Sequence, residues 1–110
     1  MLEALWAIKF SSSIGDLGSG VVVLETGKLY GGDSDFYYIG SYNRNDDNTV
    51  EASVNVRNYS GLGISIINSS NFHVKLTGTI EEELISLEGS PDVKPEVRIN
   101  VSLKKIVDLP

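Results

Sequence analysis

The chain contains no cysteine, and it has only one histidine, one methionine, one tryptophan and three prolines. The lack of cysteine excludes a disulfide framework and a thiolate metal site, and a single histidine cannot form a zinc cluster. No 18 apolar residues follow one another, so no membrane-spanning helix is expected. Nine Lys and Arg against 15 Asp and Glu give a net charge of −6. Because such a surface repels phosphate groups, we expect no direct contact with nucleic acid or with a membrane.

The N-terminal segment 1–9 has no basic region followed by an apolar one, and Lys9 interrupts its apolar residues early. It therefore does not have the pattern of a secretory signal, and a cytoplasmic location is expected. A length of 110 residues suits one domain, covering residues 1–110.

Strict alternation of apolar and polar residues is the main structural pattern in the sequence. Between Thr49 and Arg57 every second residue is apolar, which is typical of a half-buried strand. The same period recurs over 2–10, 71–80 and 96–104. Shorter candidate strands are Gly20–Glu25, Lys28–Gly31, Phe36–Tyr42, Gly63–Ile67 and Leu84–Glu88.

The pattern predicts an all-β protein of eight or nine short strands. Tight turns such as 25–28, a polar loop at 43–48 and a proline-containing turn at 90–95 separate the strands. Residues 81–83 could begin a short helix instead of a strand. Clean alternation favours antiparallel pairing, which leaves a sandwich or an up-and-down barrel. We favour a single antiparallel up-and-down β-barrel of about eight strands, because sequential hairpins meander easily and closure removes exposed edges.

The sequence provides no convincing catalytic, cofactor-binding or metal-binding residues. His73 falls on the polar face of its predicted strand, where a solvated histidine is expected. The glycine-rich segment 15–20 has the wrong spacing for a dinucleotide loop, and a strand follows it, so we expect a plain loop between strands there. The oxygen-rich loop 43–48 lacks the turn glycine of a calcium loop. Asp33 and Asp35 are two carboxylates on one extended segment, but Asp33 is better explained as a residue that closes a turn on backbone N–H groups.

One group of motifs is more specific than turn chemistry. Trp6-x-Ile8-x-Phe10 is followed by Gly18-x-Gly20-Val-x-Val23, by Gly27-x-x-x-Gly31-Gly32-Asp33 and by Tyr38-x-Gly40. In order and spacing, residues 4–57 resemble the N-terminal half of the GrlR-type negative regulators of type III secretion. The family motif falls on Gly31, Gly32, Asp33, Tyr38 and Gly40.

That resemblance implies a small lipocalin-like barrel that dimerises, has no enzymatic activity and encloses an apolar cavity. It also implies a protein partner, such as a helix-turn-helix transcriptional activator that is masked from DNA. The family's acidic loop after Tyr-x-Gly corresponds here to Asp46 and Asp47.

Three functions remain open at this point. The first is a non-enzymatic regulator that masks a protein partner. The second is a barrel that binds a small apolar ligand, with Trp6, Phe10, Tyr37 and Phe72 as possible lining residues. The third is a structural module that oligomerises through outward apolar residues such as Leu5 and Ala7.

Overall fold

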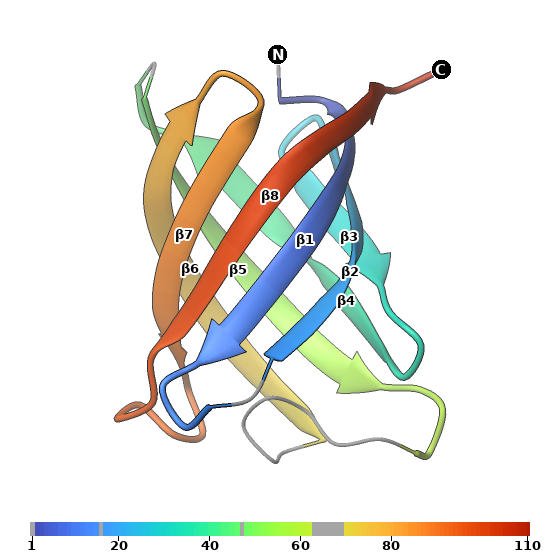
Figure 1. The fold of residues 1–110 in the computed structure, drawn as a ribbon, viewed down its shortest axis with the longest axis vertical. Helices are drawn as coiled ribbons and strands as arrows, with labels where there is room; N and C mark the ends of the chain where they lie inside the picture. Colours follow the sequence, from blue (N-terminus) through green and yellow to red (C-terminus); the bar gives the residue numbers. More distant parts are fainter. Residues whose placement is uncertain (1, 16, 47, 63–69) are drawn as a thin grey trace.

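The computed structural model describes residues 2–15, 17–46, 48–62 and 70–110. They form a closed barrel of eight strands (Figure 1). The strands are β1 (Ala4–Ser12), β2 (Leu17–Glu25), β3 (Lys28–Gly32), β4 (Phe36–Arg44), β5 (Thr49–Asn58), β6 (Asn71–Glu81), β7 (Leu84–Pro91) and β8 (Ile99–Asp108).

Each strand pairs antiparallel with the next one along the chain, and β8 pairs with β1 to close the barrel. The register between β4 and β5 is regular over nine residue pairs, from Phe36 opposite Asn58 to Arg44 opposite Val50. The prediction of an all-β, antiparallel up-and-down barrel is therefore confirmed. Among the described residues, no helix is long and apolar enough to cross a membrane.

Several predicted boundaries differ from the observed ones. Strand β2 begins at Leu17, so most of the expected glycine-rich loop is strand. The segment 81–83 is not helical, because Glu81 ends β6 opposite Leu84 and the two residues between them turn the chain. Strand β7 continues to the buried Pro91, which lies beyond its pairing with β8, where the missing N–H is tolerated. The predicted strand Gly63–Ile67 lies outside the described residues.

Each of the eight strands contributes buried, inward-facing apolar residues, and these form one core. At the end of the barrel near the chain termini this core is filled. There Trp6 is 1% exposed, and its indole Nε1–H donates a hydrogen bond of 2.9 Å to the carbonyl of Leu2. Other buried core residues include Ala4 of the same strand, Leu24 of β2 and Ile85 of β7.

Two glycines of the predicted family motif lie where adjacent strands approach closely. A Cβ on Gly31 would lie 2.0 Å from the backbone oxygen of Val21, and a Cβ on Gly40 would lie 1.9 Å from that of Ser53. These distances are far shorter than any real contact, so a side chain at either position would push two strands apart. Glycine at these positions permits the tight curvature of a small barrel.

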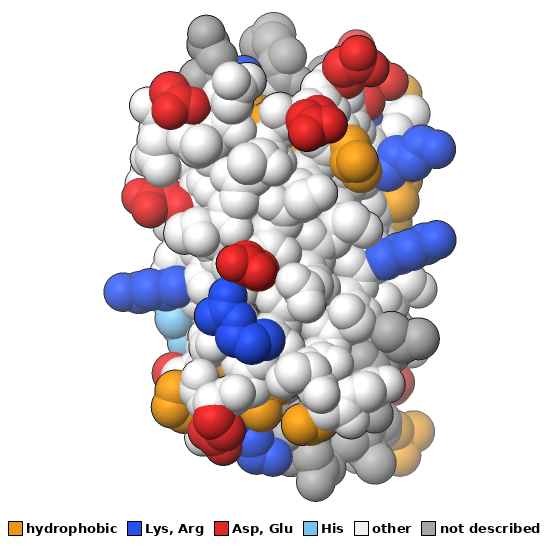
Figure 2. All heavy atoms as spheres, turned by 60° about the vertical axis from the view of Figure 1, so that its left-hand side comes forward, with side chains coloured by type: hydrophobic (Ala, Val, Ile, Leu, Met, Phe, Trp, Pro, Cys, Tyr) orange, Lys and Arg blue, Asp and Glu red, His pale blue; other side chains and the backbone are white. Residues whose placement is uncertain are grey.

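The outer surface differs from one side of the barrel to another. Figure 2 shows one side, where acidic and basic side chains are dispersed among polar atoms and hydrophobic side chains are isolated. In contrast, outward apolar residues lie next to one another across β8, β1, β2, β3 and β4. We call this group the outer strip, and it consists of Leu5, Ala7, Val21, Val23, Tyr30, Tyr37, Ile39 and Val107.

Candidate functional site

The interior of the barrel contains a cavity of about 530 Å³. Its described lining comes from all eight strands and is mainly apolar. Representative lining residues are Ile8, Val22, Leu29, Val54, Leu76 and Leu103. The cavity forms because the inward side chains near Trp6 fill the barrel, whereas those toward the β3–β4 connection leave a void.

Of the four residues that the sequence predicted as cavity lining, two line the cavity and two do not. Phe10 and Phe72 line the cavity, and the ring of Phe10 packs edge-to-face on Tyr38 at a centroid distance of 6.1 Å. Trp6 is buried but is not part of the described cavity wall. The prediction for Tyr37 was wrong, because its side chain lies on the outer face and is 42% exposed. Strand alternation gives the inner positions to Phe36 and Tyr38 instead.

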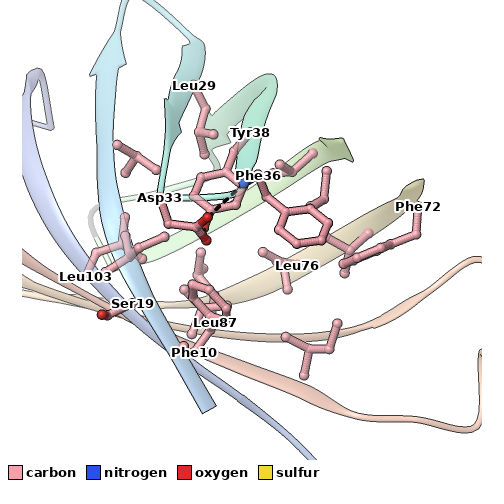
Figure 3. A pocket seen from close by; sticks show the side chains of 18 of the residues that line it. Phe10, Ser19, Leu29, Asp33, Phe36, Tyr38, Phe72, Leu76, Leu87 and Leu103 are labelled. Carbon is pink, nitrogen blue, oxygen red and sulfur yellow. Dashed lines mark hydrogen bonds between the residues drawn. The ribbon is translucent and has the colours of Figure 1, made fainter. Parts of the chain in front are cut away.

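The β3–β4 connection, residues 33–35, supplies the polar end of the cavity. Oδ1 of Asp33 accepts backbone N–H bonds from Asp35 at 2.9 Å and Phe36 at 2.8 Å, so the expected role of Asp33 in closing this turn is confirmed. Oδ2 of Asp33 accepts a hydrogen bond from the Tyr38 hydroxyl. Figure 3 shows the Asp33 carboxylate among the lining side chains, near Tyr38 and Phe10.

The protonation of Tyr38 follows from this environment. Burial, and then the hydrogen bond to Asp33 and the negative charge of that carboxylate, raise the pKa of the Tyr38 hydroxyl far above its ordinary value of 10.0. The phenol therefore keeps its proton throughout the physiological range. It acts as a permanent donor to Asp33 and holds the carboxylate in one orientation.

A second segment, residues 58–62, braces the same turn from outside. The hydroxyl of Tyr59 donates to the Asp33 carbonyl at 2.7 Å, and its N–H donates to the Asp35 carbonyl at 2.9 Å. The hydroxyl of Ser60 donates to Oδ1 of Asp35 at 2.8 Å. The Asp35 carboxylate and the backbone carbonyls of Asp33 and Asp35 are thus held by groups distant in sequence, whereas the Asp33 carboxylate is held by residues 35–38. Within the described part of the cavity wall, Asp33 and Asp35 are the charged residues, and both are acidic.

Two residues of the predicted family motif, Asp33 and Tyr38, belong to the cavity wall. Gly31 lies opposite Tyr38 and Gly32 opposite Tyr37 across the β3–β4 pairing. The inward Tyr38 in turn donates its hydroxyl hydrogen bond to Asp33. The motif can be located from the sequence, but the tertiary structure is needed to place Asp33 and Tyr38 at the polar part of a cavity.

The predicted acidic partner-binding loop lies elsewhere. Asp46 is exposed in the β4–β5 connection, at the opposite end of β4 from Asp33. Its Oδ1 accepts N–H bonds from Asn48 at 2.8 Å and Thr49 at 2.9 Å, and these bonds lower the pKa of the Asp46 carboxyl. Asp47 lies outside the described residues.

His73 has a more organised environment than the solvated surface that the sequence predicts. Its Nε2 lies 2.7 Å from the Ser53 hydroxyl, and its Nδ1 lies 3.0 Å from Oδ1 of Asn55. Ser53, His73 and Asn55 are thus connected in the same order as the nucleophile, the base and the orienting residue of a hydrolytic triad. However, this group lies on the outer face of the barrel. Ser53 pairs with both β4 and β6, so the nearby backbone N–H groups take part in sheet pairing and do not form an oxyanion hole. The network cross-links β5 and β6.

The described residues contain no group of three His, Cys, Asp or Glu side chains that could hold a metal ion. Fold and cavity together define a closed antiparallel β-barrel with an apolar interior void.

No protein-family model matches the chain, and no curated protein matches its sequence. Among solved structures, the chain is similar to one described as a redesigned beta barrel, with a TM-score of 0.71 and 13% sequence identity, over 96% of this chain and 91% of that one. At that identity the similarity concerns the fold alone.

Proposed function

We propose that this protein is a non-enzymatic binding barrel that takes a small apolar ligand into its interior. The observation that carries the proposal is the cavity of about 530 Å³ with its mainly apolar wall. Ligand sites typically measure about 300–1,000 Å³ and combine an apolar lining with a few placed polar groups. The cavity meets both criteria, with the polar groups concentrated at residues 33–35.

The physical reason to expect ligand binding is that the side chains around the void are incompletely packed. Atoms that face an empty space have no packing partners on that side and lose their dispersion contacts. An apolar ligand restores these contacts and removes its own surface from water, at about 25 cal/mol per Å². Eight-stranded barrels are wide enough to hold one small ligand in this way.

A neutral fluorescent probe, N-phenyl-1-naphthylamine, tests the proposal directly. We expect saturable binding of one probe per barrel, with an increase in fluorescence. We also expect the thermal midpoint to rise with probe concentration, because a ligand that binds only the folded state stabilises it by mass action. The absence of saturable binding both for this probe and for 1-decanol would overturn the proposal.

We also propose a second role, contact with other proteins, as in the regulators that the sequence resembles. The outer strip supports it. Its residues in one row, Leu5, Val23, Tyr30 and Ile39, are register partners across β1 to β4. Ile39 is 53% exposed and its register partner Tyr30 is 40% exposed, which is unusual for adjacent large apolar side chains on one surface.

The first partner that we propose for the outer strip is a second copy of the chain. Two molecules that each carry a net charge of −6 repel, so they associate best through a surface made of uncharged side chains. In this proposal the dimer then masks a basic, DNA-reading partner with its remaining acidic surface, including Asp46.

Sedimentation of the unaltered protein is expected to give a dimer. Ile39→Lys should shift the equilibrium to monomer, because it places a buried positive charge on each side of the interface. The matched control is Thr77→Lys, which adds the same charge at an exposed position of β6 and should leave the dimer intact. A monomeric unaltered protein, or a dimer that resists Ile39→Lys, would contradict the proposed interface.

A further inference from the structure

We infer that the ligand of the cavity carries a cationic, hydrogen-bond-donating head group, such as a protonated amine, next to Asp33 and Asp35. The rest of the molecule is apolar and occupies the void between the strands. This inference rests on the proposed ligand-binding function and specifies its chemical class. It also excludes a class that apolar barrels often suggest, the anionic fatty acids.

The charges along the described cavity wall decide between these classes. Asp33 and Asp35 are both acidic, and the described wall contains no Lys, Arg or His to oppose them. An ionised fatty acid would have to place its carboxylate against a mainly apolar wall or beside these two like charges, and both arrangements are unfavourable. An ammonium group would form a charge-assisted hydrogen bond at the same place.

The hydrogen bonds of the turn show which acceptor remains for the ligand. Oδ1 of Asp33 already accepts two backbone N–H bonds, whereas among the described residues Oδ2 accepts only the Tyr38 hydroxyl. A carboxylate oxygen can accept two bonds, so Oδ2 of Asp33 retains capacity for a donor on the ligand. Because the turn and the Tyr38 hydroxyl fix this carboxylate, little side-chain freedom is lost on binding.

The aromatic residues beside Asp33 favour the same class of head group. Phe10 and Tyr38 both line the cavity and pack edge-to-face at an interplanar angle of 84°. Figure 3 shows both rings near the Asp33 carboxylate. Aromatic rings attract ammonium groups through their quadrupole and do not attract carboxylates in this way.

Three ligands with the same ten-carbon chain test the inference: decylamine, 1-decanol and decanoate. Each is titrated below its micelle-forming concentration at pH 7 against protein loaded with N-phenyl-1-naphthylamine. Decylamine is protonated at this pH, as lysine is. We expect it to displace the probe at about a tenfold lower concentration than 1-decanol, as one hydrogen bond to a charged group predicts, and decanoate to be the weakest.

The double variant Asp33→Asn/Asp35→Asn should bind decylamine and 1-decanol equally. Asparagine keeps the side-chain oxygen that closes the turn, so the local backbone is expected to survive. The control variant Glu51→Gln/Glu96→Gln removes the same two charges from exposed positions and should keep the preference for decylamine. A preference that disappears equally in the control would show a general effect of net charge and would overturn the inference.

The outcomes separate this inference from the function on which it rests. Equal displacement by all three ligands, or strongest displacement by decanoate, would overturn the head-group inference and leave the apolar-ligand function standing. The absence of binding by the probe and by 1-decanol would overturn the function itself. Should the double variant not fold, Asp33→Asn alone carries the test, because it removes the charge from the proposed acceptor, and an unchanged decylamine preference in that folded variant would overturn the inference.

Discussion

Replacement of Trp6 by alanine is expected to lower the free energy of unfolding by about 3–5 kcal/mol, the largest effect of any single substitution considered. Trp6 is 1% exposed and belongs to the filled end of the core. Its removal would leave a large void in the core, and it would leave the carbonyl of Leu2 without its buried 2.9 Å hydrogen bond. Each of these losses destabilises the folded state.

Urea unfolding followed by far-ultraviolet circular dichroism measures this effect without relying on the tryptophan signal. Tyr37→Ala is the matched control, because it also removes an aromatic side chain but from the outer face, where Tyr37 is 42% exposed. We expect a loss of less than about 1 kcal/mol for the control. Equal losses in the two variants would contradict the packing described for the filled end.

Filling the cavity is expected to abolish most of its affinity for an apolar ligand. Val74 and Val101 both line the void, and the variant Val74→Phe/Val101→Phe would occupy part of it with two rings. A loss of only about 60 Å² of ligand contact, at about 25 cal/mol per Å², corresponds to a tenfold weaker binding. We therefore expect the dissociation constant of N-phenyl-1-naphthylamine to rise at least about tenfold.

The control for this variant is Thr77→Phe/Thr79→Phe, which adds rings of the same size at exposed positions of β6. It should bind the probe like the unaltered protein. Circular dichroism checks that the filled variant remains folded, since overpacking usually destabilises by about 1–3 kcal/mol. Val101→Phe alone is the milder alternative, because Val101 is only partly buried. Unchanged binding by a folded, filled variant would show that the probe does not occupy the interior.

Much of the fold could be predicted because each strand contains its own alternation of apolar and polar residues. In β5 the apolar Val50, Ala52 and Val54 are all buried, and the residues between them are not. That alternation depends only on the geometry of an extended chain with one wet face. The ends of strands were harder to predict where backbone pairing, and not amino-acid composition, determines them. Strand β7 continues to Pro91, which still pairs with β6 but lies beyond the pairing with β8.

The candidate site was only partly predictable. The function of Asp33 in the turn follows from the preference of aspartate for bonding nearby N–H groups, and the turn was predicted on that basis. Its bond with Tyr38 and the bracing by Tyr59 depend on how β3, β4 and the end of β5 are placed in space. Tyr37 was assigned to the wrong face because aromatic character alone does not distinguish two adjacent tyrosines.

The sequence by itself determined an all-β chain without cysteine, rich in acidic residues and arranged as sequential antiparallel hairpins. These properties follow from composition and from a period of two, which each segment expresses on its own. Only the tertiary structure decided that the barrel is filled around Trp6 and hollow near Asp33, and that apolar residues of neighbouring strands join into the outer strip. The physical reason is that a void and a continuous surface depend on the relative positions of side chains from several strands, and strand register and barrel curvature fix those positions.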